Sequence, residues 1–431
     1  MENSIENLKK SKTFCLAPWM SIHNWPDGKV YPCCVWDSGD PVGNVNDTPL
    51  VELWNSEKFK DARVKMLNGE KVSSCSRCYE LESEEGRSYR TRINELHEKC
   101  YSYVPQTKPD GTLDTMNLHL WDLRISNFCN FKCRSCGAEL SSSWHADAIE
   151  LGKRPSNSKA LMNVNDKTSF MNMIDEHYKC VDEIYFAGGE PLMMPEHYQI
   201  LDRLLELNRT DVFIRYSTNF SNLTFGKKHI FEYWKHFPKI ELYISIDGTN
   251  QIGEYVRKGY SHKKFIENMN ALKQSGLNLH MVGYVVTYGV LNYLHLFDMM
   301  LEMVEHNLIS IDGQRDDVGR VIFSPIFYPH HYDCRFLPDK YKVQFYRRLQ
   351  NFDSELRQKG LPEFYVKMLI EKLTHVYNIS MTKSFNHEHM SECVDITDKL
   401  DVLRKEKFSD IFPYYGDVKN LINNTNTKTL L

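Results

Sequence analysis

Three cysteines stand close together in the chain, at Cys129, Cys133 and Cys136, in the order C-N-F-K-C-R-S-C. A cubane iron–sulfur cluster is normally held by four cysteine thiolates, one on each iron. A cluster held by three leaves one iron open to a substrate or cofactor. The spacing C-x-x-x-C-x-x-C therefore predicts a metal centre with a vacant coordination position.

A zinc knuckle or a group of buried thiols is the alternative interpretation. A structural zinc site takes four ligands, and the next cysteine after Cys136 is Cys180. Three cysteines within eight residues are also too clustered for chance core packing. We therefore favour an iron–sulfur cluster for this stretch.

The cysteines follow an apolar run at Asn117–Ile125, and the whole arrangement resembles the signature of the radical S-adenosylmethionine (SAM) superfamily. The resemblance implies that the amino and carboxylate groups of SAM chelate the open iron. It further implies that SAM is cleaved to methionine and a 5′-deoxyadenosyl radical, which abstracts hydrogen from a substrate. The cofactors carry this chemistry, and the protein orients and shields them. One departure is Ser135, where many members have an aromatic or apolar residue.

Composition limits the other possibilities. The 431 residues are 42% hydrophobic and 26% charged, with a formal charge of −4, as in an ordinary globular protein of roughly two to three domains. The net negative charge gives no general attraction to nucleic acid or to an anionic membrane. No apolar run approaches the ~20 residues of a membrane span, and Met1–Lys12 shows no secretory pattern. We expect a cytoplasmic protein whose clustered cysteines bind metal rather than form disulfides.

Apolar strand-like runs alternate with helical stretches between Asn117 and about Phe327. This alternation predicts a parallel α/β sheet, and six units predict a partial (β/α)6 TIM-like barrel with reactive groups at the C-terminal ends of its strands. The predicted strands are Asn117–Ile125, Glu183–Ala187, Val212–Ser217, Ile240–Ile246, His280–Thr287 and Arg320–Phe327. The predicted helices are Ser169–Tyr178, Glu196–Leu207, Phe225–His236, Lys263–Gln274 and Leu291–Glu305.

The loop after the second predicted strand reads G-G-E-P, from Gly188 and Gly189 to Glu190 and Pro191. Two glycines let the backbone approach a ligand closely, and proline fixes the direction in which the chain leaves. In the family that the chain resembles, this element holds the amino group of SAM. We therefore assign Gly188, Gly189 and Glu190 to cofactor binding.

The third and fourth predicted strands also end in polar residues. The resemblance gives Ser217 and Asn219 to the ribose or carboxylate of SAM, although Phe220 stands where the family often has glycine. Ser245 and Asp247 match the family's S-x-D-G, and a carboxylate accepts well from a ribose diol.

Arg257 matches a position that often pairs with the SAM carboxylate. A guanidinium suits a planar carboxylate because two of its N–H groups can bind both oxygens. Each of these polar signals is weak alone, because such residues are usually structural or solvated. Their joint order along the chain favours the SAM-binding interpretation.

A second set of cysteines precedes the predicted barrel. It resembles the SPASM/twitch domain of radical SAM enzymes, which holds auxiliary iron–sulfur clusters. The matching pieces are C-x-x-P-W from Cys15, G-x4-C ending at Cys33, and C-x-x-C at Cys75 and Cys78. The resemblance implies one auxiliary [4Fe–4S] cluster on these four residues, with Cys34 as a substitute for Cys33 or a spectator. A structural zinc site also takes four thiolates and remains the alternative.

We expect three domains: a SPASM/twitch-like domain at 13–105, a radical SAM partial barrel at 116–328 and a helical extension at 335–420. Such a domain mostly follows the barrel in this family, so its position before the barrel is unusual. The C-terminal helices predicted at Asp339–Arg357, Pro362–Tyr377 and Ile396–Phe408 have no place in the resemblance, and the polar tail Asn420–Leu431 is expected to fray. The separate cysteines Cys100, Cys180, Cys334 and Cys393 are expected to be small buried hydrophobic residues.

These patterns favour a radical SAM enzyme, of oxidoreductase or epimerase type, that acts on a peptide or small metabolite. Its expected partners are SAM and a reductant such as flavodoxin or ferredoxin, without a membrane or nucleic acid. The alternatives are a zinc-stabilised binding protein without catalysis and a radical SAM enzyme acting on RNA; the acidic balance argues against RNA. The sequence identifies no catalytic acid or base.

Overall fold

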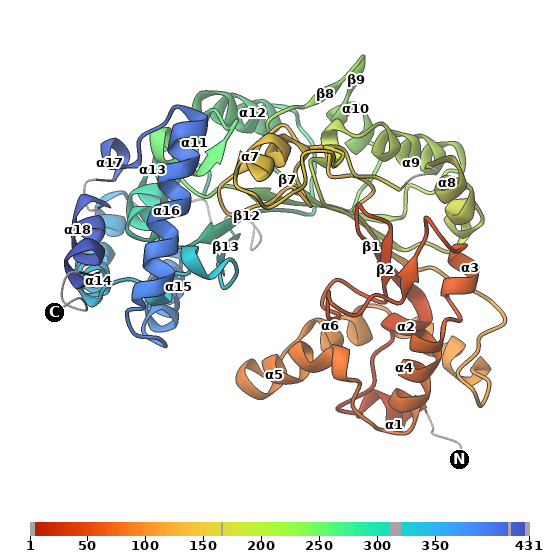
Figure 1. The fold of residues 1–431 in the computed structure, drawn as a ribbon. Coiled ribbons are helices and arrows are strands. Elements are labelled where there is room, and N and C mark those ends of the chain that lie inside the picture. Colours follow the sequence, from red (N-terminus) through yellow and green to blue (C-terminus); the bar gives the residue numbers. More distant parts are fainter. Residues whose placement is uncertain (1–4, 165–166, 310–319, 413–414, 427–431) are drawn as a thin grey trace. The chain divides into compact units, whose positions relative to one another are not determined.

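The computed structural model describes residues 5–164, 167–309, 320–412 and 415–426. The chain forms two compact units, and each is assembled from separate stretches of sequence (Figure 1). Unit 1 comprises residues 1–128, 161–216 and 232–240, and unit 2 comprises residues 129–160, 217–231 and 241–431.

The main strands belong to a mixed sheet of nine strands, which confirms the α/β class. In unit 1 the strand order is β7-β6-β4-β1-β2-β3, and in unit 2 it is β13-β12-β10. All six predicted strands are present, and those in each unit pair in parallel with their neighbours in chain order. They are β4 (Leu120–Leu123), β6 (Glu183–Phe186), β7 (Phe213–Thr218), β10 (Ile240–Ser245), β12 (Met281–Tyr288) and β13 (Arg320–Pro325).

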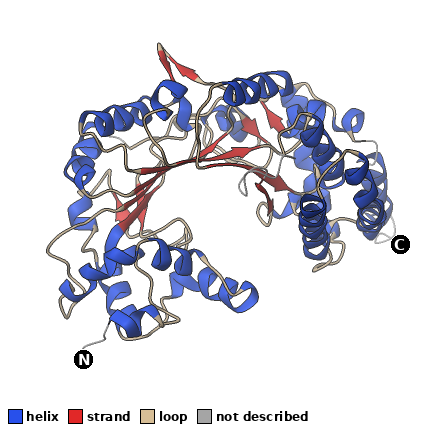
Figure 2. Ribbon diagram, turned by 180° about the vertical axis from the view of Figure 1, so that it is seen from behind, coloured by secondary structure: helices blue, strands red, loops and turns tan. Residues whose placement is uncertain are grey.

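Helices alternate with these strands, as Figure 2 shows in blue and red. Strands buried on both faces need apolar side chains on both, and Ile184, Ile214 and Tyr216 are fully buried in unit 1. The helices of unit 1 are α1 (Ile5–Lys9), α2 (Ala17–Met20), α3 (Leu50–Leu53), α4 (Glu57–Leu67), α5 (Ser76–Glu85), α6 (Tyr89–Leu96), α8 (Lys167–Asp175), α9 (Pro195–Glu206) and α10 (Ile230–Trp234, which begins in unit 2). Among its 3-10 turns are Ser73–Cys75 and Glu98–Gln106.

The turn signal at Asn24–Gly28, between two short β-like runs, predicts an N-terminal hairpin, and the structure confirms it. The hairpin also extends the main sheet, which the sequence did not predict. Strand β1 (Ser21–Asn24) pairs antiparallel with β2 (Lys29–Tyr31), and its other edge pairs in parallel with β4. The hairpin turn needs Gly28, whose φ is +87°, because only glycine adopts such angles without strain. A short third strand, β3 (Gly43–Asn44), completes this edge.

Unit 2 adds a helical C-terminal region to its strands. Helices α14 and α15 pack against each other there, and α16 contacts α18 (Figure 1). The helices of unit 2 are α7 (His145–Glu150), α11 (Asn250–Val256), α12 (His262–Gln274), α13 (Leu296–Glu305), α14 (Asp339–Gln358), α15 (Glu363–Ser380), α16 (His387–Arg404), α17 (Phe408–Ile411) and α18 (Tyr415–Asn426). Residues 427–431 of the predicted fraying tail lie outside the described residues, whereas residues 420–426 are helical.

Helical spacing at Leu50–Leu67 predicts one helix, whereas the structure has two, α3 and α4, because the backbone of Ser56 is extended with a ψ of 156°. Two further predicted helices also have different limits in the structure. The start of the predicted helix Phe225–His236 is a small hairpin, β8 (Thr224–Phe225) and β9 (Lys228–His229). Helix α16 begins at His387, well before the predicted Ile396, because Asn386 caps it through the His389 N–H.

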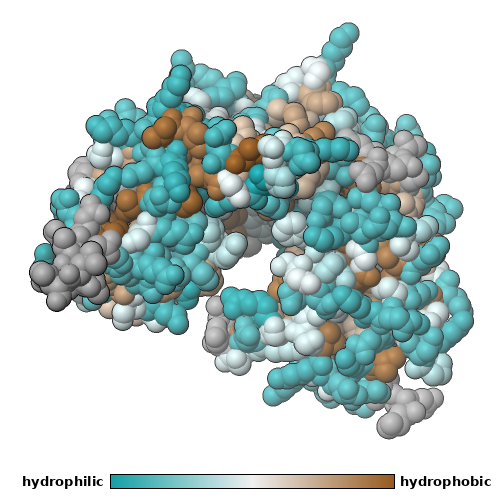
Figure 3. Space-filling view, viewed as in Figure 1, coloured by the Kyte–Doolittle hydropathy of each residue, from teal (hydrophilic) through white to brown (hydrophobic). Residues whose placement is uncertain are grey.

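No described helix is both long and apolar enough to cross a membrane. The face of the molecule drawn in Figure 3 is mostly hydrophilic, with apolar side chains scattered over it.

Candidate iron–sulfur and SAM centre

The three-cysteine loop follows β4 and is anchored in unit 2 by a two-stranded ladder. Strand β5 (Lys132–Cys133) pairs antiparallel with β11 (Arg257–Lys258), and Cys133 lies directly opposite Arg257. The structure therefore brings together two residues that are more than a hundred positions apart in the chain and that the sequence assigned to the cluster and to SAM.

Side chains just beyond the loop fix its backbone. The Ser143 hydroxyl donates to the carbonyl of Cys129 at 2.7 Å, and the Trp144 indole donates to the carbonyl of Cys133 at the same distance. The Ser142 hydroxyl accepts from the Cys129 N–H at 3.4 Å. The short 3-10 turn Ser142–Trp144 therefore holds both ends of the first cysteine spacing.

The thiols themselves are suited to a metal cluster. Cys133 is buried, and Cys129 and Cys136 are half-buried. Burial raises the pKa of Cys136 to about 12, so a bound cation is what would favour its thiolate at neutral pH. The Phe131 N–H points at the sulfur of Cys129 at 3.4 Å, and hydrogen bonds to cluster sulfurs tune reduction potential.

Arg257 is buried beside this loop and already has one partner. Its Nη1 donates to Oδ2 of Asp247 at 2.7 Å, while Oδ1 of Asp247 accepts from the Thr287 N–H at 2.8 Å. Burial lowers the pKa of the guanidinium, but the charges of Cys133 and Asp247 outweigh it and raise the pKa overall. The Nε of Arg257 is buried and has no hydrogen-bond partner among the described residues, so this side of the fork can serve a bound anion.

The polar residues at the end of β7 contact the cysteine loop. The Asn219 amide donates to the Asn130 side chain at 2.9 Å, and its nitrogen lies 4.0 Å from the sulfur of Cys129. Asn130 in turn donates to the hydroxyl of Ser221 at 2.9 Å. Ser217, at the end of β7, and Ser245, at the end of β10, are half-buried, and their predicted contacts with SAM stay predictions.

Phe220 explains why the family favours glycine at its position. Its φ is +53°, a left-handed angle that costs a side-chain-bearing residue roughly 1–2 kcal/mol. The ring is fully buried, and Asn268 donates to the Phe220 carbonyl at 2.8 Å. Packing and this hydrogen bond hold the strained turn.

The G-G-E-P loop in unit 1 needs both glycines. Their φ angles are +73° and +43°, and a Cβ on Gly189 would lie 2.3 Å from the carbonyl oxygen of Phe128. The Glu190 N–H donates to that same oxygen at 2.8 Å. Since Phe128 directly precedes Cys129, this loop is tied to the residue before the first cysteine.

We predict that Gly189→Ala destabilises the fold by roughly 2–4 kcal/mol, because left-handed strain and a clash with the Phe128 carbonyl add. Gly226→Ala is the matched control, since Gly226 also has a left-handed φ of +59° but its added Cβ meets nothing within 4 Å. The control should lose only about 1–2 kcal/mol. Urea unfolding measures both, and equal losses would contradict the close approach.

The four predicted auxiliary ligands come together in unit 1. The thiol of Cys15 interacts electrostatically with Cys78, and the thiol of Cys75 interacts with both. Cys33 interacts with Cys15 and Cys75. Burial raises the pKa of Cys15 to about 12, so these thiols also require a cation to ionise near neutral pH.

Cys34 points elsewhere. Burial raises the pKa of its thiol, and the nearby Asp122 carboxylate adds to this effect. Asp122 itself lies 3.0 Å from Nδ1 of His23, and both side chains are almost fully buried. The geometry favours Cys33 as the auxiliary ligand.

Two side chains hold the backbone on either side of Cys15. The Phe14 carbonyl accepts from Arg90 at 2.7 Å and from Asn94 at 3.0 Å, and the Leu16 N–H donates to Asn94 at 2.9 Å. Sequence patterns did not identify Arg90 or Asn94, because an Arg and an Asn on a charged helix look like solvated residues.

The C-terminal helices brace the three-cysteine loop from within unit 2. Arg134, between the second and third cysteines, is fully buried and reaches Asp401 at 2.5 Å and Glu406 at 2.8 Å, while its guanidinium lies 3.7 Å from the ring centre of Tyr255. A small core joins the same elements, formed by Ala138, Trp144, Ala148, Ile396 and Leu400. The extension that the resemblance left unexplained thus supports the loop.

We predict that Arg134→Ala costs about 3–5 kcal/mol of stability, because it leaves the largely buried Asp401 carboxylate without its cation and Glu406 with Lys258 alone. Arg348→Ala is the control: Arg348 also binds two carboxylates, but its side chain is 41% exposed, so about 1 kcal/mol or less is expected. Chemical denaturation of both variants is the measurement. A similar small loss for both would show that the buried network does not stabilise the loop.

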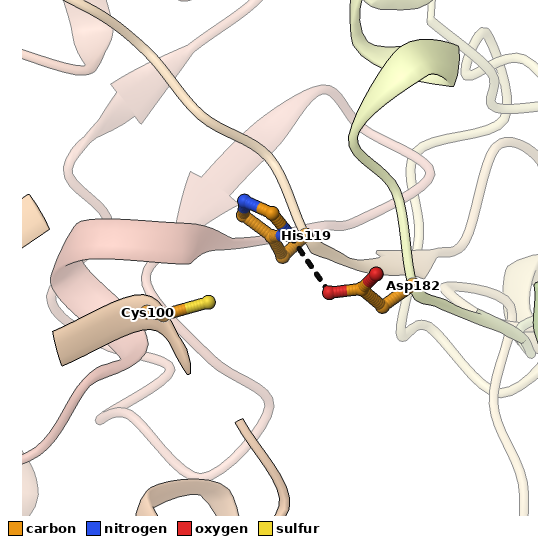
Figure 4. A group of neighbouring side chains, drawn as sticks. All are labelled: Cys100, His119 and Asp182. Atoms are coloured by element: carbon orange, nitrogen blue, oxygen red, sulfur yellow. Dashed lines mark hydrogen bonds and ion pairs between the residues drawn. The ribbon is translucent and has the colours of Figure 1, made fainter. Parts of the chain in front are cut away.

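Cys100 is not simply a small hydrophobic residue, as the sequence suggested. Its sulfur lies near the side chains of His119 and Asp182 (Figure 4), and one ligand atom from each lies within 4.8 Å of the others. Both imidazole nitrogens are already used, however: His119 bonds Asp182 at 2.7 Å and the Tyr103 hydroxyl at 2.9 Å. We read this group as a hydrogen-bonded network in unit 1.

The family comparison agrees with the positions of the two cysteine sets: residues 123–293 match the radical SAM superfamily, and residues 15–79 match the SPASM iron–sulfur cluster-binding domain. The chain thus carries a radical SAM domain with a SPASM domain before it. A radical SAM domain implies a [4Fe–4S] cluster and SAM, a SPASM domain implies auxiliary iron–sulfur binding, and members of the radical SAM superfamily are generally enzymes.

None of the curated proteins compared with the chain matches it. Among solved structures, Streptococcus suis SuiB bound to the precursor peptide SuiA is 14% identical over 59% of this chain and 53% of its own, with a TM-score of 0.32. The tagged anSMEcpe with bound AdoMet is 16% identical over 53% of this chain and 59% of its own, with a TM-score of 0.33. The chain thus aligns with little more than half of either protein, and similarity of this degree says nothing about a substrate.

Proposed function

We propose that the protein reductively cleaves SAM and uses the resulting 5′-deoxyadenosyl radical to abstract hydrogen from a peptide or small metabolite. The observation that carries the proposal is the three-cysteine loop, with Arg257 buried opposite Cys133. When bound, the cluster and SAM supply the electron transfer and the radical. The protein's own part is to hold, orient and shield them.

Cys129, Cys133 and Cys136 are the proposed ligands of the SAM-binding cluster. Three protein donors leave one iron for the amino and carboxylate groups of SAM. The N–H of Phe131 would then stabilise the negative charge on the sulfur of Cys129. Asn219, whose amide nitrogen is 4.0 Å from the same sulfur, borders the cluster on the side of β7.

Arg257 is the proposed partner of the SAM carboxylate. Its buried Nε has no hydrogen-bond partner among the described atoms, and an uncompensated buried donor favours an anionic ligand. Asp247 holds the other side of the fork at 2.7 Å and thereby limits its rotation. Because both oxygens of Asp247 are engaged within the protein, we assign it the positioning of Arg257 in addition to its predicted ribose contact.

The remaining SAM contacts are proposed from the resemblance. Gly188, Gly189 and Glu190 would serve the amino group, since the absence of side chains on the glycines exposes backbone oxygens. Ser217 and Ser245 would serve the ribose hydroxyls. Their half-buried positions at strand ends support this assignment.

Cys15, Cys33, Cys75 and Cys78 are the proposed ligands of one auxiliary [4Fe–4S] cluster. Four thiolates leave no iron open, so this cluster would accept or relay an electron rather than bind SAM. A reductant such as flavodoxin or ferredoxin would supply the electron for SAM cleavage. The match of residues 15–79 to an iron–sulfur cluster-binding domain favours this interpretation over zinc. The net negative charge of the chain argues against RNA as substrate.

Substitution of Arg257 tests the SAM site. Arg257→Ala should weaken SAM binding about 30-fold or more, because a buried charge-assisted contact is worth 2–5 kcal/mol. Arg257→Lys keeps the charge but lacks the fork, so it should be intermediate in affinity and preserve the fold through Asp247. Titration calorimetry on the reconstituted protein measures both variants. Unchanged SAM affinity in both would contradict the assignment.

A further inference from the structure

A separate set of metal-ligating side chains lies in unit 2, formed by His262, Glu302 and His306. One ligand atom from each lies within 4.8 Å of the other two. His262 is the first residue of α12, Glu302 lies in α13, and His306 directly follows α13. Glu302 and His306 share one helical face because they are four residues apart. Two imidazoles and one carboxylate thus converge from two helices.

The outer nitrogen of His262 lacks a hydrogen bond. Its Nε2 is buried and has no hydrogen-bond partner among the described residues, although it lies only 2.8 Å from a carboxylate oxygen of Glu302. The distance is short enough for a hydrogen bond, so the angle between the nitrogen and the oxygen is what prevents one.

Two atoms that bind the same metal ion also lie this close together without forming a hydrogen bond. Bonds of about 2.1 Å at angles of about 90–109° place two ligand atoms about 3.0–3.4 Å apart, each aimed at the ion. The observed separations from Glu302 Oε1 are 2.8 Å to His262 Nε2 and 3.9 Å to His306 Nε2. These values lie on either side of the expected range, so small side-chain rotations would accommodate an ion.

Neighbouring side chains orient two of the three ligands. The Tyr260 hydroxyl hydrogen-bonds the other nitrogen of His262 at 2.9 Å, and the Asn250 amide donates to both oxygens of Glu302 at 2.8 and 2.9 Å. Such contacts fix ring and carboxylate orientation in metal sites.

We propose that His262, Glu302 and His306 bind one divalent transition-metal ion of the zinc class, with water completing the coordination on the side of exposed His306. Two imidazoles and a carboxylate suit such ions. The site is distinct from both cysteine sets and does not depend on the proposed radical chemistry. By linking α12 and α13, and through Asn250 the start of α11, the bound ion would stabilise this part of unit 2.

The test counts ions on the reconstituted holo-protein, whose thiolates are occupied by iron. Dialysis against Co²⁺ under anaerobic conditions, followed by elemental analysis, should give about one cobalt per chain for the wild type. His306→Ala should lower the affinity for cobalt at least tenfold. Because 42% of the His306 side chain is exposed, the substitution should not disturb folding. His236→Ala, another exposed histidine, is the matched control and should bind as the wild type does.

The absorption spectrum locates the ion. Cobalt bound by nitrogen and oxygen lacks the intense charge-transfer band of a cobalt thiolate, so a spectrum without that band, lost in His306→Ala and in Glu302→Gln, supports the site. Equal cobalt binding by His306→Ala and the wild type would overturn the proposal. So would a wild-type protein that takes up cobalt only with the thiolate band, or takes up none.

Discussion

Replacement of Cys129, Cys133 and Cys136 together by alanine is expected to abolish SAM cleavage and to halve the iron content. The reconstituted wild type should hold about eight irons per chain, from two cubanes of four irons each, and the variant about four. Without the open iron, the variant has no position for the amino and carboxylate groups of SAM. Iron analysis and chromatography of 5′-deoxyadenosine after dithionite reduction measure the two effects.

The control for this variant is a chain in which Cys334 and Cys393 are replaced by alanine. Both are buried cysteines of unit 2 that belong to neither set. The control should retain about eight irons and cleave SAM. Release of 5′-deoxyadenosine by the triple variant would refute the assignment of the three cysteines.

Replacement of Cys75 and Cys78 should remove the other cluster and leave SAM cleavage partly intact. About four irons should remain per chain, and 5′-deoxyadenosine should still form, uncoupled from substrate oxidation. The reason is that these two thiols belong to a set in unit 1, whereas the proposed ligands of the SAM cluster lie in unit 2.

Cys33→Ala and Cys34→Ala form a sharper pair for the same cluster, because the two residues are adjacent in the chain. Cys33 interacts electrostatically with Cys15 and Cys75, whereas Cys34 interacts with the Asp122 carboxylate. Cys33→Ala should therefore destabilise the auxiliary cluster, and Cys34→Ala should keep it. A zinc content that stays the same in all of these variants, with no iron in the auxiliary set, would contradict an auxiliary iron–sulfur cluster.

The parallel strands could be predicted from sequence because each is a short apolar run followed by turn residues. Adjacent residues such as Leu120 and Trp121 of β4 are both buried and lie on opposite faces, so their strand shows a continuous apolar signal. The three proposed ligands of the SAM-binding cluster were equally visible, because they lie within eight residues of one another. The family comparison matches a SPASM segment and a radical SAM segment of the chain.

Contacts between distant segments could not be predicted in this way. The pairing of β1 with β4 depends on the register of two short strands a hundred residues apart. Arg134 contacts Asp401, and no sequence pattern near either residue indicates that the two are in contact. The same is true of His262 and Glu302, which no motif connects.

The choice between Cys33 and Cys34 shows the limit most clearly. The two thiols are chemically identical, and the G-x4-C pattern alone left Cys34 possible as a substitute. Only the backbone of the loop after β2 decides which sulfur faces Cys15 and which faces Asp122.

The central claim is that SAM binds the open iron of the three-cysteine cluster. Electron paramagnetic resonance of the dithionite-reduced Cys75→Ala/Cys78→Ala variant tests it directly, because only that cluster should then give a signal. The account predicts that SAM shifts the signal and that SAM carrying ¹⁵N in its amino group shows hyperfine coupling to it. A signal that SAM leaves unchanged, without any ¹⁵N coupling, would contradict the account.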